Sequence, residues 1–576
     1  MKGRAWFPRA RKEEIDMCKR IFQTGIWGVI LVAALSTFVT ACSAAITPAA
    51  LTATPVQSKT AELTPKSAIP SATKGGKLTI VYAIAELKSL DADIFGTDYA
   101  AVICSWVSDT LVGADKDGSF KPYLATQWQV SEDGKTWTFK LRKDVKFHDG
   151  TPFNAEAVKF KFERILDPKT QSQKTAMLGP VSSMEVLDEY TFRITHKEPF
   201  PQFLDSISTG YFAMWSPTAV NKYGLDDFQR HLVGTGPFVL KEHKPGDRYV
   251  FAKNPDYNWA PSYMKHQGPA YLDEVTIRFV AEAATSVAVF KSGEADIVIR
   301  FPAQHAPDYR NNPKYQVLDA PFTGSPVLFV MNTMKPPLDD LKVRKAIEHA
   351  VNQGEIVKAV WRGEAIVARG VMYPNSPCYW REAEQVYPYD VKRAKTLLEE
   401  DGWRPGADGI NEKDGKKLQI TIVNHNNYQE IGPPVQAQLK EIGVDAKIEV
   451  VPGAIQNERA ANGDFHMIFQ HMAYSDPGVL DLLYNSKNAK PGGWAWSRYA
   501  DPKLDELLNK SATTIDMGKR CQLLTEAQKI VVNNALVLPL YGRIEIAVMA
   551  PTVKGFSFGP RPNVDEWLYD TYVEKN

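Results

Sequence analysis

The stretch FHDGTPFNAEAVK at residues 147–159 carries the most information about the fold of this chain. It follows DGKTWTF at 133–139, so two Asp-Gly pairs stand where the chain is expected to reverse. The segment up to Leu141 therefore predicts two strands closed by a turn. Pro152 then leads into apolar residues at helical spacing, which predicts an amphipathic helix. Nothing in the segment suits catalysis, so a function in binding is expected.

Length and charge narrow the classes of function. The chain has 576 residues, enough for two to four domains. It carries 68 basic and 67 acidic residues, a formal net charge of +1. Such a balance gives no whole-protein field that would attract nucleic acid or an anionic membrane surface, and no nucleic-acid partner is expected.

The first residues have the pattern of an export signal. Basic residues precede an apolar run from Ile21 to about Val39, and Val-Thr-Ala then stands directly before Cys42. This pattern predicts a signal peptide at 1–41, and the alternative is an uncleaved membrane anchor. The cysteine after Val-Thr-Ala resembles a bacterial lipobox, which implies lipidation of Cys42. Translation starts at Met1 or at Met17, and in either case the bulk of the protein is expected outside the cytoplasm.

Residues 42–74 are rich in Ala, Thr, Pro and Ser and predict a flexible tether. Beyond Cys42, no apolar run is long enough to cross a bilayer. The cysteines beyond Cys42 are Cys104, Cys378 and Cys521, which allow one disulfide at most. Buried free thiols are the expected state, with a single bridge as the alternative.

Strand and helix signals continue through the rest of the chain. KLTIVY at 77–82 predicts a strand that leaves a Gly pair, and VGTGPFVL at 233–240 predicts a sharp reversal before another strand. The second half alternates helix and strand, which predicts a mixed or mostly parallel sheet flanked by helices.

These motifs resemble, in their order, those of the large extracytoplasmic solute-binding proteins of ABC importers, the peptide/nickel-binding family. NPDY at 254–257 and LDEVTIR at 272–278 extend the resemblance, which covers the chain from Gly75 to about Phe558. The resemblance implies an α/β, two-lobe periplasmic-binding-protein fold with mixed sheets and an extra subdomain inserted in the first lobe. A ligand would lie in the cleft between the lobes, closed by a hinge motion.

The resemblance also implies where the domains begin and end. Carried over to this chain, the ranges are 75–112, 226–322 and 536–576 for lobe I, 113–225 for the inserted subdomain, and 323–535 for lobe II.

The sequence lacks the motifs of common enzymes and metal sites. It has no Walker A or His-Glu-x-x-His pattern. His148, within a turn, is expected to make structural hydrogen bonds. His466 and His471 lie five residues apart, so on a strand their rings point to opposite faces. No catalytic activity, cofactor or metal site is expected.

The loop FQHMAYSDPG at 469–478 is the first candidate for ligand binding. It follows an apolar strand and should surface at the carboxyl end of that strand, where open α/β sheets bind ligands. His471, Tyr474 and Asp476 are its candidate side chains. In peptide-binding relatives an Asp in this loop resembles a partner for the peptide α-amino group, but the Trp that usually precedes it is absent here. Asp476 is therefore either an amine anchor or the structural Asp of an Asp-Pro pair.

Trp494 and Trp496 form the second candidate. Spaced by two residues, they would face the same side of an extended segment. Their rings either stack on a ligand in the cleft or pack against the helix expected at 504–508.

The expected function is capture of peptides by a monomeric, lipid-anchored extracytoplasmic protein that delivers them to an ABC permease and its ATPase. The alternative within the same fold is an oligosaccharide- or glycoside-binding protein, followed by a binder of chelated nickel. An exported hydrolase and a surface sensor or chaperone are alternatives of other classes.

Overall fold

The computed structural model describes residues 75–94 and 97–574. The expected signal peptide, the tether and Cys42 lie outside the described residues. Among the helices within them, none is long and apolar enough to span a membrane.

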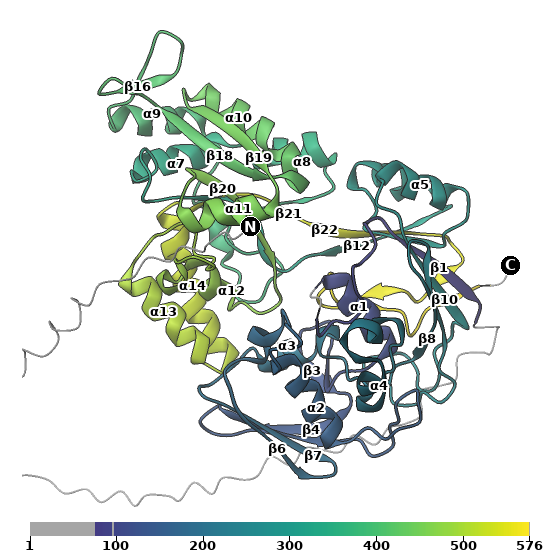
Figure 1. Ribbon diagram of the computed structural model, residues 1–576. Coiled ribbons are helices and arrows are strands. Elements are labelled where there is room, and N and C mark those ends of the chain that lie inside the picture. The colour runs from purple at the N-terminus through teal and green to yellow at the C-terminus, as the bar shows by residue number, and fades with distance from the viewer. Residues whose placement is uncertain (1–74, 95–96, 575–576) are drawn as a thin grey trace, which may run out of the picture. The chain divides into compact units, whose positions relative to one another are not determined.

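A seven-stranded mixed sheet forms the centre of what we call lobe I (Figure 1). Its parallel core is β1 between β10 and β11, and antiparallel strands complete both sides. Side chains of β1 are buried on both faces, because Ile80 and Val81 belong to different apolar clusters. In spatial order the strands are β12 (Gln316–Pro321), β22 (Ile544–Met549), β11 (Ile297–Ile299), β1 (Lys77–Tyr82), β10 (Glu274–Phe279), β9 (Arg248–Lys253) and β8 (Phe238–Lys244). Its helices are α1 (Asp98–Val107), α5 (Ala283–Lys291) and α6 (Pro307–Arg310).

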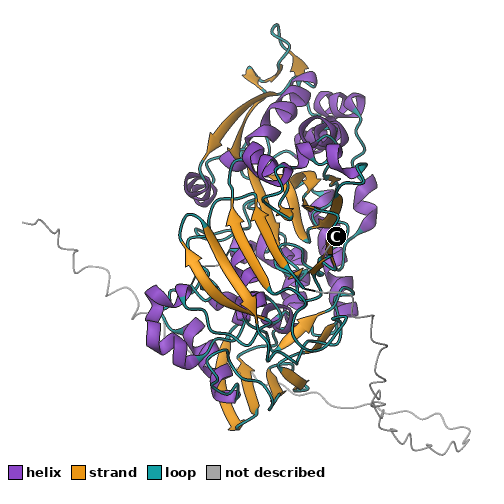
Figure 2. Cartoon of the chain, turned by 90° about the vertical axis from the view of Figure 1, so that its right-hand side faces the viewer, coloured by secondary structure: helices purple, strands orange, loops and turns teal. Residues whose placement is uncertain are grey.

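The segment that opened the sequence analysis folds as predicted. The two strands form a hairpin, with Gly134 at a φ of 71° in its turn. They belong to a four-stranded antiparallel sheet, the insertion sheet, at the lower end of Figures 1 and 2. The helix begins after Asn154, whose side chain accepts a hydrogen bond from the Ala157 N–H. The strands are β4 (Ala125–Val130), β5 (Thr136–Leu141), β7 (Thr191–His196) and β6 (Val181–Asp188), and the helices are α2 (Ala155–Leu166), α3 (Phe203–Ile207) and α4 (Pro217–Asp227).

A six-stranded mixed sheet with helices on both faces forms lobe II. All eight residues of β13 are buried, and Phe329 and Val330 point into the clusters on opposite faces. In order the strands are β14 (Ile366–Val367), β21 (Val537–Gly542), β13 (Gly324–Met331), β20 (Met467–Ala473), β18 (Gln419–His425) and β19 (Asp445–Val451). The helices are α7 (Leu341–Ala350), α8 (Gln353–Trp361), α9 (Val391–Glu400), α10 (Gly432–Glu441), α11 (Gly453–Asn462), α12 (Val479–Tyr484), α13 (Pro502–Thr513) and α14 (Met517–Asn533).

Five short pairings complete the described strands. They join β2 (Val112–Ala114) to β3 (Phe120–Pro122), β15 (Arg404–Pro405) to β16 (Asn411–Lys413), β16 to β17 (Lys416–Lys417), β23 (Val553–Lys554) to β26 (Tyr572–Val573), and β24 (Ser557–Phe558) to β25 (Glu566–Trp567).

The chain passes between the two large sheets at two short crossings. It leaves lobe I through Phe322 and Thr323, between β12 and β13, and returns through Arg543, between β21 and β22. The Phe322 N–H donates to the Arg543 carbonyl over 3.1 Å, so the crossings lie side by side. The return comes later than the expected residue 536, because β21 still pairs in lobe II. A fully buried strand has the same apolar pattern in either sheet. The sequence of β21 therefore does not show to which lobe this strand belongs.

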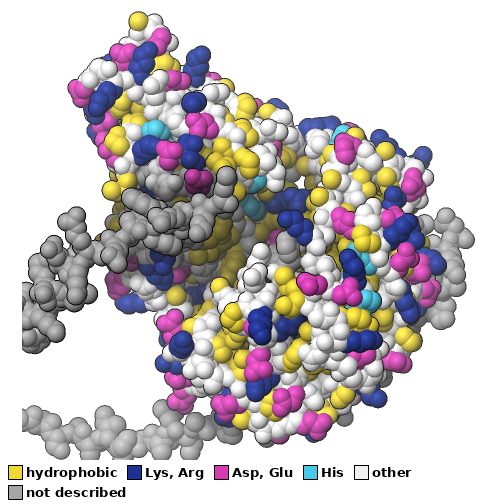
Figure 3. All heavy atoms as spheres, viewed as in Figure 1, with side chains coloured by type: hydrophobic (Ala, Val, Ile, Leu, Met, Phe, Trp, Pro, Cys, Tyr) yellow, Lys and Arg dark blue, Asp and Glu magenta, His cyan; other side chains and the backbone are white. Residues whose placement is uncertain are grey.

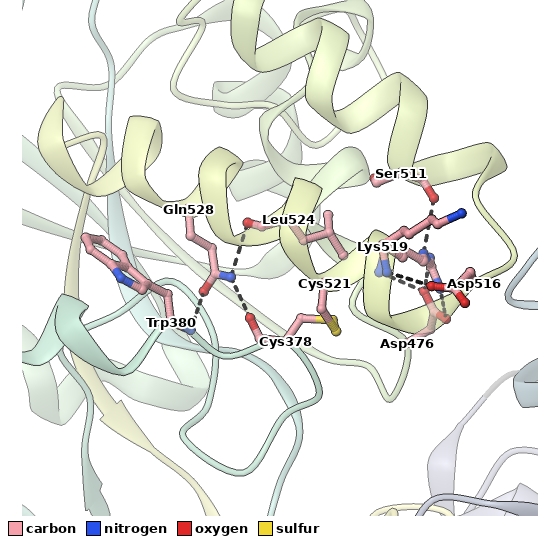
Figure 4. Close-up of a disulfide and its surroundings, with 11 residues drawn as sticks. Cys378, Trp380, Asp476, Ser511, Asp516, Lys519, Cys521, Leu524 and Gln528 are labelled. Carbon is pink, nitrogen blue, oxygen red and sulfur yellow. Dashed lines mark hydrogen bonds and ion pairs between the residues drawn. A yellow bond between two sulfur atoms is a disulfide. The ribbon is translucent and has the colours of Figure 1, made fainter. Parts of the chain in front are cut away.

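A disulfide joins Cys378 to Cys521 on α14, so the expectation of free thiols is wrong for these two residues and holds for buried Cys104. Figure 4 shows the bridge beside Gln528 of the same helix. The Gln528 amide donates to the Cys378 carbonyl over 2.8 Å and accepts from the Trp380 N–H over 3.2 Å. The loop that carries Cys378 is thus fastened to α14 by a covalent bond and two hydrogen bonds.

Candidate functional site

The carboxyl ends of parallel strands from both large sheets bring polar side chains together near the crossings. Arg300 directly follows β11 in lobe I, and Tyr428 comes shortly after β18 in lobe II. Arg543 lies in the second crossing and donates to the Tyr428 hydroxyl over 3.3 Å. This is the position at which open α/β sheets bind ligands.

Three basic side chains and three tyrosines form this group, which we call the basic cluster: Arg300, Arg543, His471, Tyr99, Tyr373 and Tyr428. Arg300 donates to the Tyr99 hydroxyl over 3.3 Å. The Arg543 guanidinium lies 4.6 Å from the ring centre of Phe322. His471, which the sequence analysis selected, shares a hydrogen bond of 3.1 Å with the Tyr373 hydroxyl. The cluster therefore combines groups from lobe I, lobe II and a crossing.

The two arginines keep an excess of positive charge. Their guanidinium groups donate to tyrosine hydroxyls, and neither forms an ion pair with a carboxylate of the described residues. Glu545 is an acid on which the charges of both arginines act; it accepts from Tyr99, and its Oε1 has no hydrogen-bond partner. Burial raises the pKa of Glu545, and the charges of Arg300 and Arg543 oppose that rise. Burial, and then these two charges, hold the pKa of His471 well below its usual value, so its ring is neutral at pH 7.

A cavity of about 140 Å³ lies where the insertion sheet region, lobe II and the C-terminal segment meet. Its polar lining includes Asp98, Lys174, Asp205, Tyr211, Tyr474, Ser475, Arg561 and Asn563. The Ser475 hydroxyl donates to the Asp205 carboxylate and so joins lobe II to α3. Tyr474, also selected from the sequence, thus lines a cavity whose walls come from lobe II and from the region around α3.

Asp98, the first residue of α1, contributes a carboxylate to the wall of this cavity. Asp98 accepts from the Tyr211 hydroxyl over 2.6 Å and from the Asn563 amide over 3.2 Å. The Lys174 ammonium lies 3.5 Å from the ring centre of Tyr211, and burial lowers the pKa of Lys174 to about 8. Because Asp98 and Tyr99 are adjacent on α1, the cavity and the basic cluster share one helix end.

Figure 3 shows a recess on the viewed face, with hydrophobic side chains on its walls and Lys, Arg and His side chains at its rim. Apolar walls with a few convergent polar groups are typical of sites for small solutes.

Asp476, the predicted amine anchor, already has a partner. Both of its carboxylate oxygens accept from Arg520 on α14, over 2.6 and 2.5 Å, and both side chains are buried. One of these oxygens also accepts from the Gly478 N–H. The structure therefore places Asp476 in an internal ion pair, which is the structural alternative of the sequence analysis (Figure 4).

Trp494 and Trp496 stack on each other, with ring centres 5.2 Å apart. Trp496 is 6% exposed, and its indole N–H donates to the Gly493 carbonyl. Both rings pack in the apolar cluster of lobe II that contains Leu504 and Leu508. This arrangement agrees with the alternative in which the two rings pack against the helix at 504–508 instead of stacking on a ligand.

Within residues 75–94 and 97–574, no three His, Cys, Asp or Glu side chains are placed to hold a metal ion. His466 of the sequence-selected pair uses its Nδ1 to accept from the Thr421 N–H.

Sequence reasoning missed Arg300 and Arg543, although a signal was present. Each follows an apolar strand directly, in DIVIR and in VLPLYGR. The strand-end rule that selected 469–478 applies equally to both.

Comparisons with known proteins agree with this architecture. The model of the bacterial extracellular solute-binding proteins, family 5, matches residues 119–494. The chain is 29% identical over 458 residues to the glutathione-binding protein GsiB of Shigella flexneri serotype 5b, a match that covers 78% of this chain and 86% of GsiB.

Two solved structures show the same two-lobe fold. NikA from Brucella suis, in complex with Fe(III)-EDTA, has a TM-score of 0.76 and 26% identity, and covers 86% of this chain and 99% of its own. DppA from Helicobacter pylori, in complex with the peptide STSA, has a TM-score of 0.70 and 26% identity. The match covers 87% of this chain and 99% of the DppA chain. The predicted fold class is confirmed.

Proposed function

Because this chain belongs to the bacterial extracellular solute-binding proteins of family 5, we propose that it is the substrate-binding component of an ABC importer and that it captures a peptide or a small peptide-like solute. The proposal includes delivery of the solute to a membrane permease, without chemical change.

One observation carries the choice of a peptide-like solute: groups of both charges converge near the crossings. Arg300 and Arg543 offer positive charge, and Asp98 lies one residue from Tyr99 of the same cluster. A peptide always brings an ammonium and a carboxylate, which suit such a pair of subsites. The relative GsiB binds glutathione, and the similar DppA was solved with a peptide.

The mechanism that we propose is capture by two lobes. A solute that contacts lobe I through Arg300 and lobe II through Tyr428 binds the closed arrangement more tightly than the open one. It therefore raises the population of the closed state, which the permease recognises. In this proposal the crossings at Phe322–Thr323 and Arg543 form the hinge.

The proposed location is the outer face of the cell membrane, with the protein monomeric and held by lipid on Cys42 after removal of residues 1–41. The sequence of the export signal supports this part of the proposal. Mass spectrometry of the N-terminal peptide from membranes would test it. A diacylglycerol-modified Cys42 is expected, and an N-terminus upstream of Cys42 would contradict it.

A carboxylate chelate of a metal ion is the second candidate for the solute. The arginines of the basic cluster suit several carboxylates, and the similar NikA was solved with Fe(III)-EDTA. The sugar-binding alternative, which the aromatic richness of the chain and the loop at 471–476 motivated, has less support, because Trp494 and Trp496 pack against the apolar cluster of lobe II.

The test is identification of the natural solute. Mass spectrometry of molecules released from gently purified protein should yield peptides. Titration calorimetry with glutathione, a pool of di- to pentapeptides, Fe(III)-EDTA and cello-oligosaccharides then ranks the candidates. Micromolar or tighter binding of a peptide is expected. Binding of the sugars alone, or turnover of any probe, would overturn the proposal.

A further inference from the structure

We propose that the buried carboxyl group of Glu545 takes up a proton when the solute is captured, so that this protein binds an anionic solute more tightly as the pH falls. Glu545 lies behind the basic cluster and is too deeply buried to contact the solute itself. The inference rests on the proposed function, in which a negatively charged group of the solute lies beside Arg300 and Arg543.

The first step is the position of Glu545. It is the second residue of β22 and comes two residues after Arg543 of the crossing. Its side chain is buried, with an exposed fraction of 1%. One carboxyl oxygen accepts from the Tyr99 hydroxyl over 3.1 Å, and the same hydroxyl accepts from Arg300 over 3.3 Å. Tyr99 therefore connects a buried acid to an arginine of the basic cluster.

The second step is the vacant oxygen of this carboxyl group. The Oε1 atom of Glu545 is buried and has no hydrogen-bond partner among the described residues. A buried oxygen without a donor is unfavourable, above all when it carries negative charge. Burial accordingly raises the pKa of Glu545. A proton bound at this group would remove the buried charge.

The third step is the balance of charge around Glu545. The charges of Arg300 and Arg543 oppose the effect of burial on its pKa and so favour its ionised form in the free protein. His471, the third basic side chain of the cluster, is neutral at pH 7 and adds no further charge. The ionised state of Glu545 therefore depends on the two arginines.

A second buried acid, Glu566 of β25, interacts with Glu545. Glu566 accepts from the Tyr82 hydroxyl over 2.6 Å, and its exposed fraction is 2%. Burial raises the pKa of Glu566 well above its usual value, and the charge of Glu545 raises it further. Burial also raises the pKa values of Tyr82 and Tyr99, so both hydroxyls stay neutral. Glu566 is thus the acid that stays protonated, and Glu545 is the one whose charge can change.

The fourth step links this proton to the solute. An anion beside Arg300 and Arg543 offsets the two charges that stabilise ionised Glu545. The pKa of Glu545 is then higher in the complex than in the free protein, and a proton is taken up at any pH between the two values. By linkage, the affinity for the solute rises as the pH falls through this interval. One linked proton changes Kd by at most about tenfold per pH unit.

The experiment counts protons by calorimetry of the mature protein with glutathione and with trialanine. At pH 6, binding heats in MES and in Bis-Tris, which differ in ionisation enthalpy, give the number of protons taken up. Affinities between pH 5.5 and 7.5 are then measured for the wild type, Glu545→Gln and Glu566→Gln. The control is Glu294→Gln, because the carboxylate of Glu294 is 60% exposed and pairs with Arg278 at the surface.

We expect the wild type to take up about 0.5–1 proton per bound solute and to bind about three- to tenfold more tightly at pH 5.5 than at pH 7.5. Glu545→Gln should lose both effects. Glu566→Gln should keep them, because an amide replaces an acid that is already neutral, and Glu294→Gln should match the wild type. Lys174, with a pKa of about 8, and the α-amino group of a peptide are already protonated at pH 6 and contribute little.

Circular dichroism and the thermal midpoint show whether each variant folds. If Glu545→Gln does not fold, infrared difference spectra of the wild type decide, because capture of the solute should add the C=O band of a protonated carboxyl group.

Binding without proton uptake, equal uptake in the wild type and in folded Glu545→Gln, or no new carboxyl band would overturn the proton site while the proposed function stands. Failure of the wild type to bind either probe, with an uncharged solute released from the purified protein instead, would overturn both proposals.

Discussion

At the scale of single residues, the pairing of Asp476 with Arg520 decides between two roles for one carboxylate. Removing one partner of a buried ion pair leaves the other charge uncompensated. We expect Arg520→Met to lower the free energy of unfolding by about 3 kcal/mol, and Asp476→Asn by a similar amount. Urea unfolding followed by far-UV circular dichroism measures this.

The control for that prediction is Asp464→Asn, because the carboxylate of Asp464 is 60% exposed and pairs with Lys335 at the surface. Its effect should stay below about 1 kcal/mol. Loss of peptide binding in Asp476→Asn with unchanged stability would instead support the amine-anchor role of Asp476.

His148 gives the molecule a dependence on pH that can be assigned to one ring. Its Nδ1 accepts from the Gly234 N–H, and its Nε2 donates to the Gly236 carbonyl, so both nitrogens are used by the neutral form. Burial lowers the pKa of His148 from 6.5 to about 4. Below pH 6.5 the unfolded chain takes up a proton that the folded chain does not, so this stabilisation is lost as the pH falls from 6.5 towards 4.

Between pH 7.5 and pH 5 we expect His148 to account for a loss of up to about 2 kcal/mol in the free energy of unfolding. Urea unfolding of wild type and His148→Gln at both pH values measures it, with exposed His231→Gln as the control. The variant should lose less stability on acidification than the wild type. An identical loss in both proteins would show that the ring contributes nothing.

That His148 makes structural hydrogen bonds could be predicted from its position in a turn, although its partners Gly234 and Gly236 lie 86 and 88 residues away. The partner of Asp476 could not, since Arg520 lies 44 residues away on a helix whose orientation is set by packing. The strand-end rule selected Tyr474 and His471; the Tyr474 N–H donates to the Thr323 carbonyl of the first crossing, and His471 belongs to the basic cluster. Their role in ligand binding stays a prediction. Trp494 and Trp496 show a limit of prediction from sequence, because aromatic spacing does not distinguish a ring that faces a ligand from one that faces a core.

At the scale of elements, the disulfide fastens α14 to the loop that contains Cys378. The two cysteines are separated by 143 residues, and a bridge that closes so long a loop restricts the unfolded chain strongly. We expect the double variant Cys378→Ser, Cys521→Ser to lose about 2–4 kcal/mol of stability. Thermal unfolding with and without a reducing agent tests this.

Reduction should destabilise the wild type and leave the double variant unchanged, because Cys104 is not bridged. Affinity for peptides should change little, since neither cysteine belongs to the basic cluster. Unchanged stability on proven reduction would mean that the hydrogen bonds of Gln528 hold the loop without it.

The elements themselves were largely predictable, and their assignment to sheets was less so. The hairpin β4–β5 and helix α2 follow from turn residues and periodicity within a short window. The sheet to which β21 belongs is set by its pairing with β13, more than 200 residues earlier. A local sequence pattern contains no information about such a distant pairing. The sequence therefore predicts where strands lie better than where one lobe ends.

At the scale of the whole folded part, contacts between lobe II and the insertion sheet region should control closure. The Ser475 hydroxyl reaches Asp205 of α3, and the cavity beside this contact is lined by both regions. The hydrogen bond forms only when these regions are close, so its removal should favour the open state without altering either lobe.

We expect Ser475→Ala to raise the radius of gyration of the solute-free protein in small-angle X-ray scattering, because fewer molecules are closed. Saturating peptide should restore the wild-type value, at an affinity reduced by about three- to tenfold, since the solute must now close the lobes without this hydrogen bond. Ser183→Ala, an exposed position of β6, is the control and should behave as wild type. A weaker affinity with unchanged scattering would instead make Ser475 a direct contact of the solute, because a hydroxyl that binds only the solute has no influence on the empty protein.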